Sequence, residues 1–92
     1  MAKFMVFWET DPSRVPLDPK ERASWYDLMY DMVEDDLKKG ETDWGQFPAS
    51  MKGYCIFEGL TEEKIEERLR RYIPYIKMEI QPVLSLSQVR KL

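Results

Sequence analysis

The sequence predicts an α+β domain in which a four-stranded antiparallel sheet carries two helices on one face. Three segments, residues 3–9, 52–58 and 75–80, place apolar side chains at every second position, as strands with one buried face do. Two helical stretches lie between them, so the predicted order is strand, helix, strand, strand, helix, strand. The apolar positions of the three strands are Phe4, Val6, Trp8, Cys55, Phe57, Ile76, Met78 and Ile80.

The opposite positions of these strands carry charges, and the charges indicate how the strands pair. In the usual antiparallel arrangement of this order, the first strand lies between the third and the fourth and runs opposite to both. Opposite charges that face each other across such a pair contribute about 0.2–1 kcal/mol each. The pairs expected from this topology are Lys3 with Glu58 and Glu79, and Glu9 with Lys52 and Lys77.

The first helix has clear start and stop signals. Asp18 is expected to cap it, Pro19 suits its first position, Glu21 completes a capping box, and Gly40 ends it after Lys39. Its apolar arc is wider than the stripe of roughly 100° that packs a helix on one core, so we expect a second subunit, the C-terminal tail or a ligand to cover its margins. The arc contains Trp25, Tyr26, Leu28, Met29, Tyr30, Met32, Val33 and Leu37.

The remaining elements are specified unevenly. The second strand falls within residues 42–47, and Gly45 favours an edge strand with a bend. The second helix is expected to begin at a Thr61 cap and to end before Pro74. Its predicted buried stripe is Ile65, Leu69, Tyr72 and Ile73.

With 92 residues the chain is expected to form a single domain, residues 1–92. Residues 82–92 form a tail that is rich in leucine and valine, so we expect the tail to pack rather than to remain in water. Ser85 or Ser87 is a candidate cap for one short helical turn there, and in a dimer the tail could cross onto the partner.

Composition and charge exclude several classes of function. The net charge is −3 with both signs interspersed, which disfavours nucleic acid and anionic membranes as partners. There is no histidine and one cysteine, so no intramolecular disulfide or zinc cluster is expected. No bound metal and no cofactor are expected. No stretch is long and apolar enough for a bilayer, and a cytoplasmic protein is the expectation. Abundant Glu, Lys and Arg with no asparagine is typical of heat-adapted proteins.

One segment, Lys52-Gly53-Tyr54-Cys55-Ile56-Phe57-Glu58-Gly59, resembles the third-strand signature of RNA-recognition domains. Its later aromatic positions hold Ile56 and Gly59, which leaves only Tyr54 to stack on a base. Glu9, Glu58 and Glu79 share the same face and would repel phosphates. RNA binding is therefore kept only as a remote alternative.

The whole chain resembles small ferredoxin-like proteins of the dimeric α+β barrel group. The resemblance rests on the Lys3-Phe-Met-Val start, the Trp44-Gly45 and Lys52-Gly53-Tyr54 stretches, and the closing run from Tyr75 to Pro82-Val83-Leu84. It implies a homodimer whose two sheets face each other, and a pocket between each sheet and its helices. Members include cofactor-free oxygenases, isomerases, haem-degrading enzymes and stress-response proteins. The histidine and asparagine that serve catalysis in such relatives are absent here, so no catalytic residue is carried over.

Several side chains are candidates for binding or chemistry. Aromatic rings with a polar N–H or O–H suit a ligand pocket, and Glu58 with Glu79 would form an acid and base pair if buried together. A structural ion-pair ladder through Lys3 is the favoured interpretation of the two glutamates. Cys55 and the run Glu34-Asp35-Asp36 are interpreted as a core residue and a solvated helix face. The candidate ligand-binding residues are Trp8, Tyr26, Trp44, Tyr54, Glu58 and Glu79.

Two functional hypotheses follow. In the first, a homodimer binds a small hydrophobic or aromatic ligand, or acts on one as a cofactor-independent enzyme. In the second, the protein is a non-catalytic assembly or interaction module. Both require a dimer through the open face of the sheet, since that face would otherwise leave apolar side chains in water. The expected centre of this interface is Met5, Phe7, Tyr54, Ile56 and Tyr75.

Overall fold

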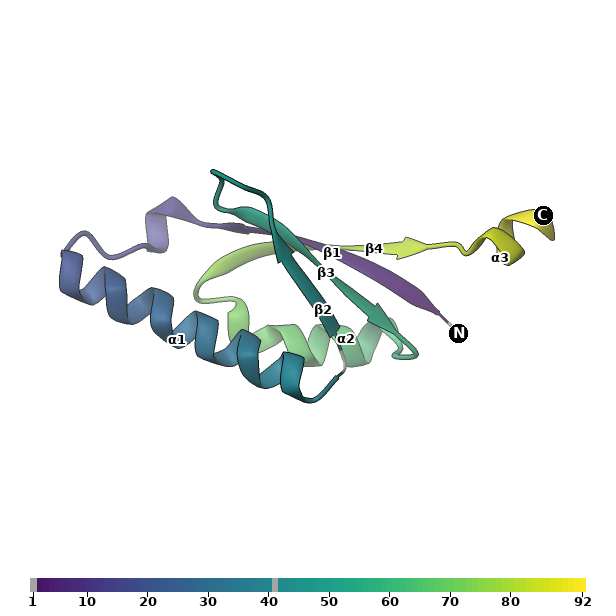
Figure 1. The fold of residues 1–92 in the computed structure, drawn as a ribbon, viewed down its shortest axis with the longest axis horizontal. Coiled ribbons are helices and arrows are strands. Elements are labelled where there is room, and N and C mark those ends of the chain that lie inside the picture. Colours follow the sequence, from purple (N-terminus) through teal and green to yellow (C-terminus); the bar gives the residue numbers. More distant parts are fainter. Residues whose placement is uncertain (1, 41) are drawn as a thin grey trace.

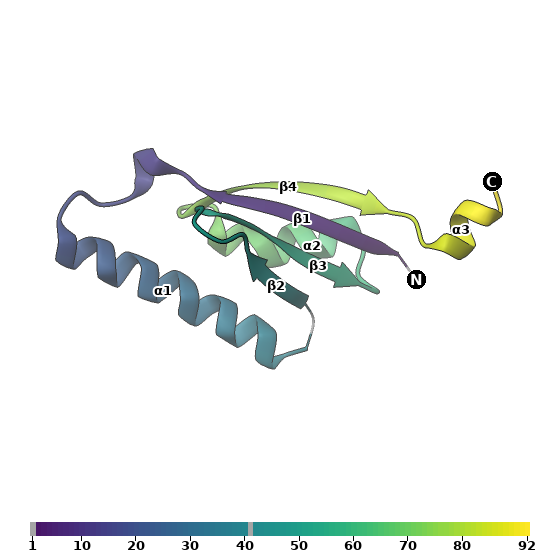
Figure 2. The same cartoon turned by 45° about the horizontal axis from the view of Figure 1, so that its top comes forward.

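A computed structural model describes residues 2–40 and 42–92. The predicted element order and antiparallel sheet are confirmed, with strand order β2-β3-β1-β4 and both main helices on one side of the sheet (Figure 1; Figure 2). The strands and helices are β1 (Lys3–Thr10), η1 (Pro12–Arg14), α1 (Pro19–Lys38), β2 (Thr42–Gln46), β3 (Lys52–Glu58), α2 (Glu62–Leu69), η2 (Arg70–Tyr72), β4 (Ile76–Val83) and α3 (Leu86–Arg90).

The hydrophobic core lies between the inner face of the sheet and the two helices. Val6 and Ile65 are fully enclosed, and Trp8 is 4% exposed. The predicted inward set therefore faces the helices, because alternate residues of a strand point to the same side. The buried core residues are Val6, Trp8, Met29, Val33, Phe57, Ile65, Leu69, Tyr72 and Ile76.

The pairing of β1 with β3 is the expected one. Lys3 lies opposite Glu58, and its Nζ is 3.2 Å from Glu58 Oε1. At the other end Glu9 lies opposite Lys52 on β3, with 3.9 Å between the charged atoms, and opposite Lys77 on β4. These exposed pairs favour this register and add little to stability.

The expected approach of Lys3 to Glu79 is wrong. Lys3 lies opposite Val83, and Glu79 lies opposite Phe7. Partner numbers in an antiparallel pair have a constant sum, which is 86 for β1 with β4. The pair Glu9 and Lys77 obeys this sum and the pair Lys3 and Glu79 does not, so the two expectations were incompatible with one register.

Both main helices begin at the predicted cap residues. Asp18 Oδ2 accepts a hydrogen bond from the Glu21 amide at 3.1 Å, and Thr61 Oγ1 accepts one from the Lys64 amide at 3.2 Å. Gly40 follows α1 with a φ of +71°, a left-handed conformation that glycine adopts without the clash of a side chain.

The predicted stripe of the second helix is correct for three residues and wrong for Ile73. Ile65, Leu69 and Tyr72 are buried, whereas Ile73 is 51% exposed. After Leu69 the chain tightens into the 3₁₀ turn η2, which has about three residues per turn instead of 3.6. This change of period turns Ile73 away from the core.

Tyr75 does not belong to the open face of the sheet, contrary to expectation. β4 begins one residue later, at Ile76, and the Tyr75 ring lies 5.2 Å from the Trp25 ring on α1. The outer face of the sheet, the one turned away from the helices, therefore has Met5, Phe7, Tyr54 and Ile56 as the apolar residues of its two central strands, and Val83 lies on the same face at the end of β4. Phe7 is 43% exposed.

The tail contains the expected short helix, α3. Ser85 caps it and forms a reciprocal capping box with Gln88. In the single chain α3 stands beyond the end of β4, away from both main helices (Figure 1; Figure 2). Leu86 is 70% exposed and Val89 is 49% exposed, so the packing expected for residues 82–92 remains a prediction about an assembly.

Candidate functional site

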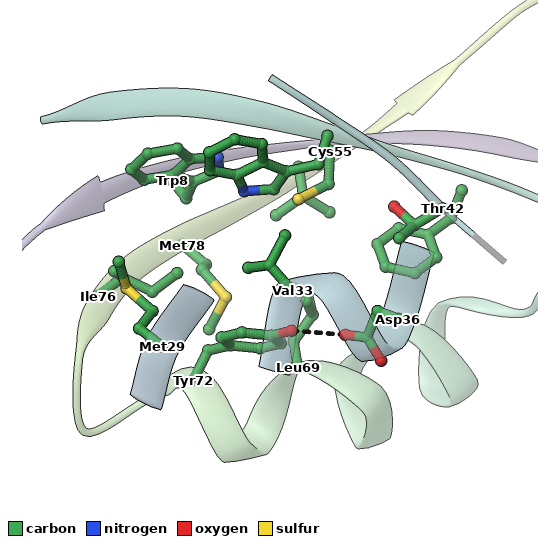
Figure 3. A pocket seen from close by; sticks show the side chains of 13 residues that line it. Trp8, Met29, Val33, Asp36, Thr42, Cys55, Leu69, Tyr72, Ile76 and Met78 are labelled. Atoms are coloured by element: carbon green, nitrogen blue, oxygen red, sulfur yellow. Dashed lines mark hydrogen bonds between the residues drawn. The ribbon is translucent and has the colours of Figure 1, made fainter. Parts of the chain in front are cut away.

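A small cavity lies between the inner face of the sheet and the two helices (Figure 3). Its volume is about 30 Å³, and its wall is mostly apolar. Every strand contributes to the wall, as do α1, α2 and η2. The lining residues are Val6, Trp8, Met29, Val33, Asp36, Thr42, Trp44, Cys55, Phe57, Leu69, Tyr72, Ile76 and Met78.

The sheet side of the cavity is formed by two stacked indole rings. Trp8 on β1 and Trp44 on β2 have ring centroids 5.4 Å apart and an angle of 9° between their planes. Gly53 of β3 lies opposite Trp8, and a Cβ atom at Gly53 would come within 2.4 Å of the Trp8 ring. The absence of a side chain at Gly53 is therefore what lets the indole lie flat on the sheet.

The helix side of the cavity has a polar cluster that joins α1 to η2. The Tyr72 hydroxyl donates a hydrogen bond to Asp36 Oδ2 at 2.5 Å (Figure 3), and Arg71 Nη2 donates to Asp36 Oδ1. Arg71 Nη2 also donates to the Met32 carbonyl at 3.2 Å. The Asp36 side chain is only 15% exposed, so both donors satisfy a largely buried carboxylate.

The surroundings of Tyr72 and Cys55 keep both groups protonated at neutral pH. Burial, and then the hydrogen bond to Asp36, raise the pKa of Tyr72 well above its ordinary value. Burial raises the pKa of the Cys55 thiol to about 12, and the carboxylates of Asp36 and Asp43 add to this. A protonated thiol is a poor nucleophile, which agrees with the interpretation of Cys55 as a core residue.

Two polar atoms on the inner side of β1 are buried without a hydrogen-bond partner. They are Trp8 Nε1 and Thr10 Oγ1. A buried donor without a partner costs about 1–3 kcal/mol, and native proteins contain few of them. Trp8 lines the cavity with its ring, and its N–H is enclosed, so a guest with an acceptor atom would reach this donor only after neighbouring side chains move.

The structure brings together two of the six predicted ligand-binding residues. Trp8 and Trp44 line the cavity, whereas Tyr26 packs beside the core with its ring 5.0 Å from Trp25. Tyr54 lies on the outer face, where its ring is 6.1 Å from Phe47. The alternation of β3 determines this, because Tyr54 neighbours the inward Cys55.

Glu58 and Glu79 also lie on the outer face, and they are not adjacent. Glu58 lies opposite Lys3, and Glu79 lies opposite Phe7, four positions further along β1. The ion-pair interpretation applies to Glu58 with Lys3. The single chain does not bring the two carboxylates together as an acid and base pair.

Sequence reasoning missed the polar cluster, because Asp36 was interpreted as part of a solvated face. Asp36 follows Val33 by three positions and Met29 by seven, and both of these are buried. Residues at such spacings share one side of a helix, so the spacing itself was the available signal. What the sequence alone could not indicate is that Tyr72 and Arg71 meet this carboxylate from another element.

Within the described ranges, no group of three or more His, Cys, Asp or Glu residues is placed to hold a metal ion. In the same residues, no helix has the length and apolar character that crossing a membrane requires. A scan against models of known protein families matches none, and a search of curated proteins finds no significant relative.

Proposed function

We propose that the protein is a homodimeric assembly domain whose two copies associate through the outer face of the sheet. The observation that carries the proposal is an apolar strip on the two central strands, in which Phe7 is exposed and its neighbours Met5, Tyr54 and Ile56 are half-buried. An open sheet face of this kind would be adhesive in water, and a second copy covers it with an identical strip.

The charges around the strip suit a contact between identical surfaces. One end carries Lys3 with Glu58, and the other carries Glu9 with Lys52 and Lys77. Each end thus holds both signs, so the same surface turned by a twofold axis offers opposite charges to itself. Such complementarity contributes mainly to the specificity and orientation of association.

The dimensions of the chain also favour association. Its radius of gyration is 14.9 Å, against about 12 Å expected for a compact domain of this length. The extents are 53 × 25 × 21 Å, and the tail contributes to the long axis. An elongated chain with apolar side chains at its periphery is typical of a protomer that is completed by a partner.

Sedimentation of the intact chain across a dilution series tests the proposal, with Phe7→Ala as the informative variant. About 85 Å² of the Phe7 ring is exposed if its full area is about 200 Å², which corresponds to about 2 kcal/mol in each copy. The dimer contains two such rings, so we expect its Kd to rise on the order of 10³-fold.

Leu17→Ala is the matched control, because Leu17 is 93% exposed and lies in the loop before α1. Its dimer should dissociate at the same concentration as the wild type. A chain that sediments as a monomer at every accessible concentration would refute the proposal.

A second function, binding of a small uncharged ligand in the cavity, is favoured by the unpartnered Trp8 N–H. The present volume of about 30 Å³ is far below the several hundred Å³ typical of ligand sites. Binding would therefore require Met29 and Met78, two flexible side chains of the wall, to move. Phenol is a suitable probe, since it has an apolar ring and an acceptor oxygen.

Titration with phenol should change the tryptophan fluorescence and raise Tm, and Trp8→Phe should weaken both effects because it removes the N–H donor. Trp25→Phe is the control, since Trp25 is not among the lining residues. Equal responses of the two variants would reject this site.

A further inference from the structure

We infer that the C-terminal segment, residues 84–92, of one copy docks on the outward face of α1 of a second copy. The inference rests on the proposed self-association and names a contact beyond the sheet interface. Leu84, Leu86, Val89 and Leu92 are 57%, 70%, 49% and 93% exposed in the single chain.

The segment is ordered in a way that an unattached tail would not be. Five residues are too few for a helix to persist alone in water, because helix nucleation is unfavourable. Yet Ser85 and Gln88 form a complete capping box that specifies a helical turn. Leu86 and Val89 are three residues apart, so they lie on one side of this turn and form a small apolar face.

The outward face of α1 offers the complementary surface. Its centre is acidic, with Asp27, Asp31 and Glu34 exposed, and the exposed lysines on the same side, Lys20 and Lys38, lie at the two ends of the helix. Exposed apolar side chains flank this stripe, with Leu28 at 56%, Leu37 at 41% and Tyr30 at 38%. The apolar arc of α1 is wider than its contact with its own core, and these three residues are its uncovered margins.

The signs of charge select this surface. Residues 84–92 include Arg90 and Lys91 and contain no Asp or Glu, so the segment is basic. The exposed face of α2 mixes Glu62, Glu63 and Glu67 with Lys64 and offers no comparable apolar margin. A basic apolar segment is therefore better matched to α1 than to α2.

The segment that docks on α1 comes from a second copy, because the chain's own tail lies far from the start of its own α1. α3 extends beyond the end of β4, at the opposite end of the molecule from the start of α1, in both ribbon views (Figure 1; Figure 2). Within its own chain, Lys91 borders a shallow depression with Lys3 and Glu58, and the apolar residues of the tail take no part in it. Those residues remain available for another molecule.

Disulfide trapping between two different chains tests the contact. Both chains carry Cys55→Ala, so the only thiols are introduced ones. One chain carries Val89→Cys and the other Leu28→Cys, and the mixture is oxidised after equilibration. We expect a disulfide joining residues 89 and 28 of different chains, identified by mass spectrometry of the linked peptides.

The matched control replaces Leu28→Cys by Leu17→Cys, a more exposed position away from the acidic stripe. We expect about tenfold less mixed disulfide there. Arg90→Glu in the tail chain should lower the yield at least about threefold, and Asp31→Lys with Glu34→Lys in the other chain should restore it. Equal yields at positions 28 and 17, or no effect of charge, would overturn the docking site.

Sedimentation of the same samples separates this inference from the proposed dimer. If the samples sediment as dimers but no disulfide forms between residues 89 and 28, the tail contact is refuted and the sheet interface stands. A monomeric chain would refute both. Deletion of residues 84–92 should weaken the dimer about tenfold or more if the tail docks across it.

Discussion

The hydrogen bond from Tyr72 to Asp36 offers a sharp test of what joins α1 to η2. Replacing Tyr72 by phenylalanine removes the hydroxyl and keeps the ring, which is 5% exposed. The lost bond is short, 2.5 Å, and its acceptor is a carboxylate. Hydrogen bonds to charged groups contribute about 1.5–3 kcal/mol.

Asp36 keeps its contact with Arg71 in this variant, so the carboxylate is not left entirely without a donor. We therefore expect Tyr72→Phe to lower the free energy of unfolding by about 2 kcal/mol. For a domain of this size that loss corresponds to a decrease in Tm of roughly 8–16 °C. Urea unfolding followed by tryptophan fluorescence measures the free energy directly.

The pH dependence provides an independent check. The pKa of Tyr72 is raised in the folded state, mainly by burial and then by Asp36. As the pH rises, the unfolded chain therefore loses the Tyr72 hydroxyl proton before the folded chain does. The contribution of Tyr72 to the free energy of unfolding is constant below about pH 10 and declines above it, by up to 1.4 kcal/mol per pH unit. The advantage of the wild type over Tyr72→Phe should therefore shrink above pH 10.

Tyr30→Phe is the control, because Tyr30 lies on α1 and is 38% exposed. This substitution should change the free energy of unfolding by less than about 0.5 kcal/mol. A loss below about 0.5 kcal/mol in Tyr72→Phe, or an equal loss in the control, would show that the Tyr72 bond does not stabilise the fold.

Three further predictions concern single residues. Gly53→Ala should destabilise by at least about 1–3 kcal/mol in urea unfolding, since its Cβ would lie 2.1 Å from the Gly45 carbonyl oxygen; wild-type stability would contradict the packing. Cys55, whose pKa is raised to about 12, should react with iodoacetamide at pH 8 at least tenfold more slowly in the native protein than in urea, and equal rates would show an accessible thiolate. The pKa of Asp11 is lowered from 3.8, mainly by hydrogen bonds from Ser13, so its contribution to stability is fully present above pH 3.8 and declines as the pH falls. The difference in unfolding free energy between wild type and Asp11→Asn should therefore shrink on acidification, and a constant difference would contradict this.

The sequence determined the fold class, because the patterns that specify it are local. Alternation in β1, β3 and β4 decided which side chains face the helices, and the caps at Asp18 and Thr61 decided where the two main helices begin. Each of these signals involves residues a few positions apart. None of them depends on residues that are distant in the sequence.

Only the tertiary structure decided the candidate site, because the site depends on residues distant in sequence. Asp36 and Tyr72 meet because α1 and η2 lie on the same side of the sheet. Trp8 stacks on Trp44 because β3 lies between their two strands and has a glycine opposite Trp8. The register between β4 and β1, which sets Glu79 opposite Phe7, was likewise decided by how the two strands pair. Periodicity assigns a residue to a face, whereas its neighbour on that face depends on how the elements pack.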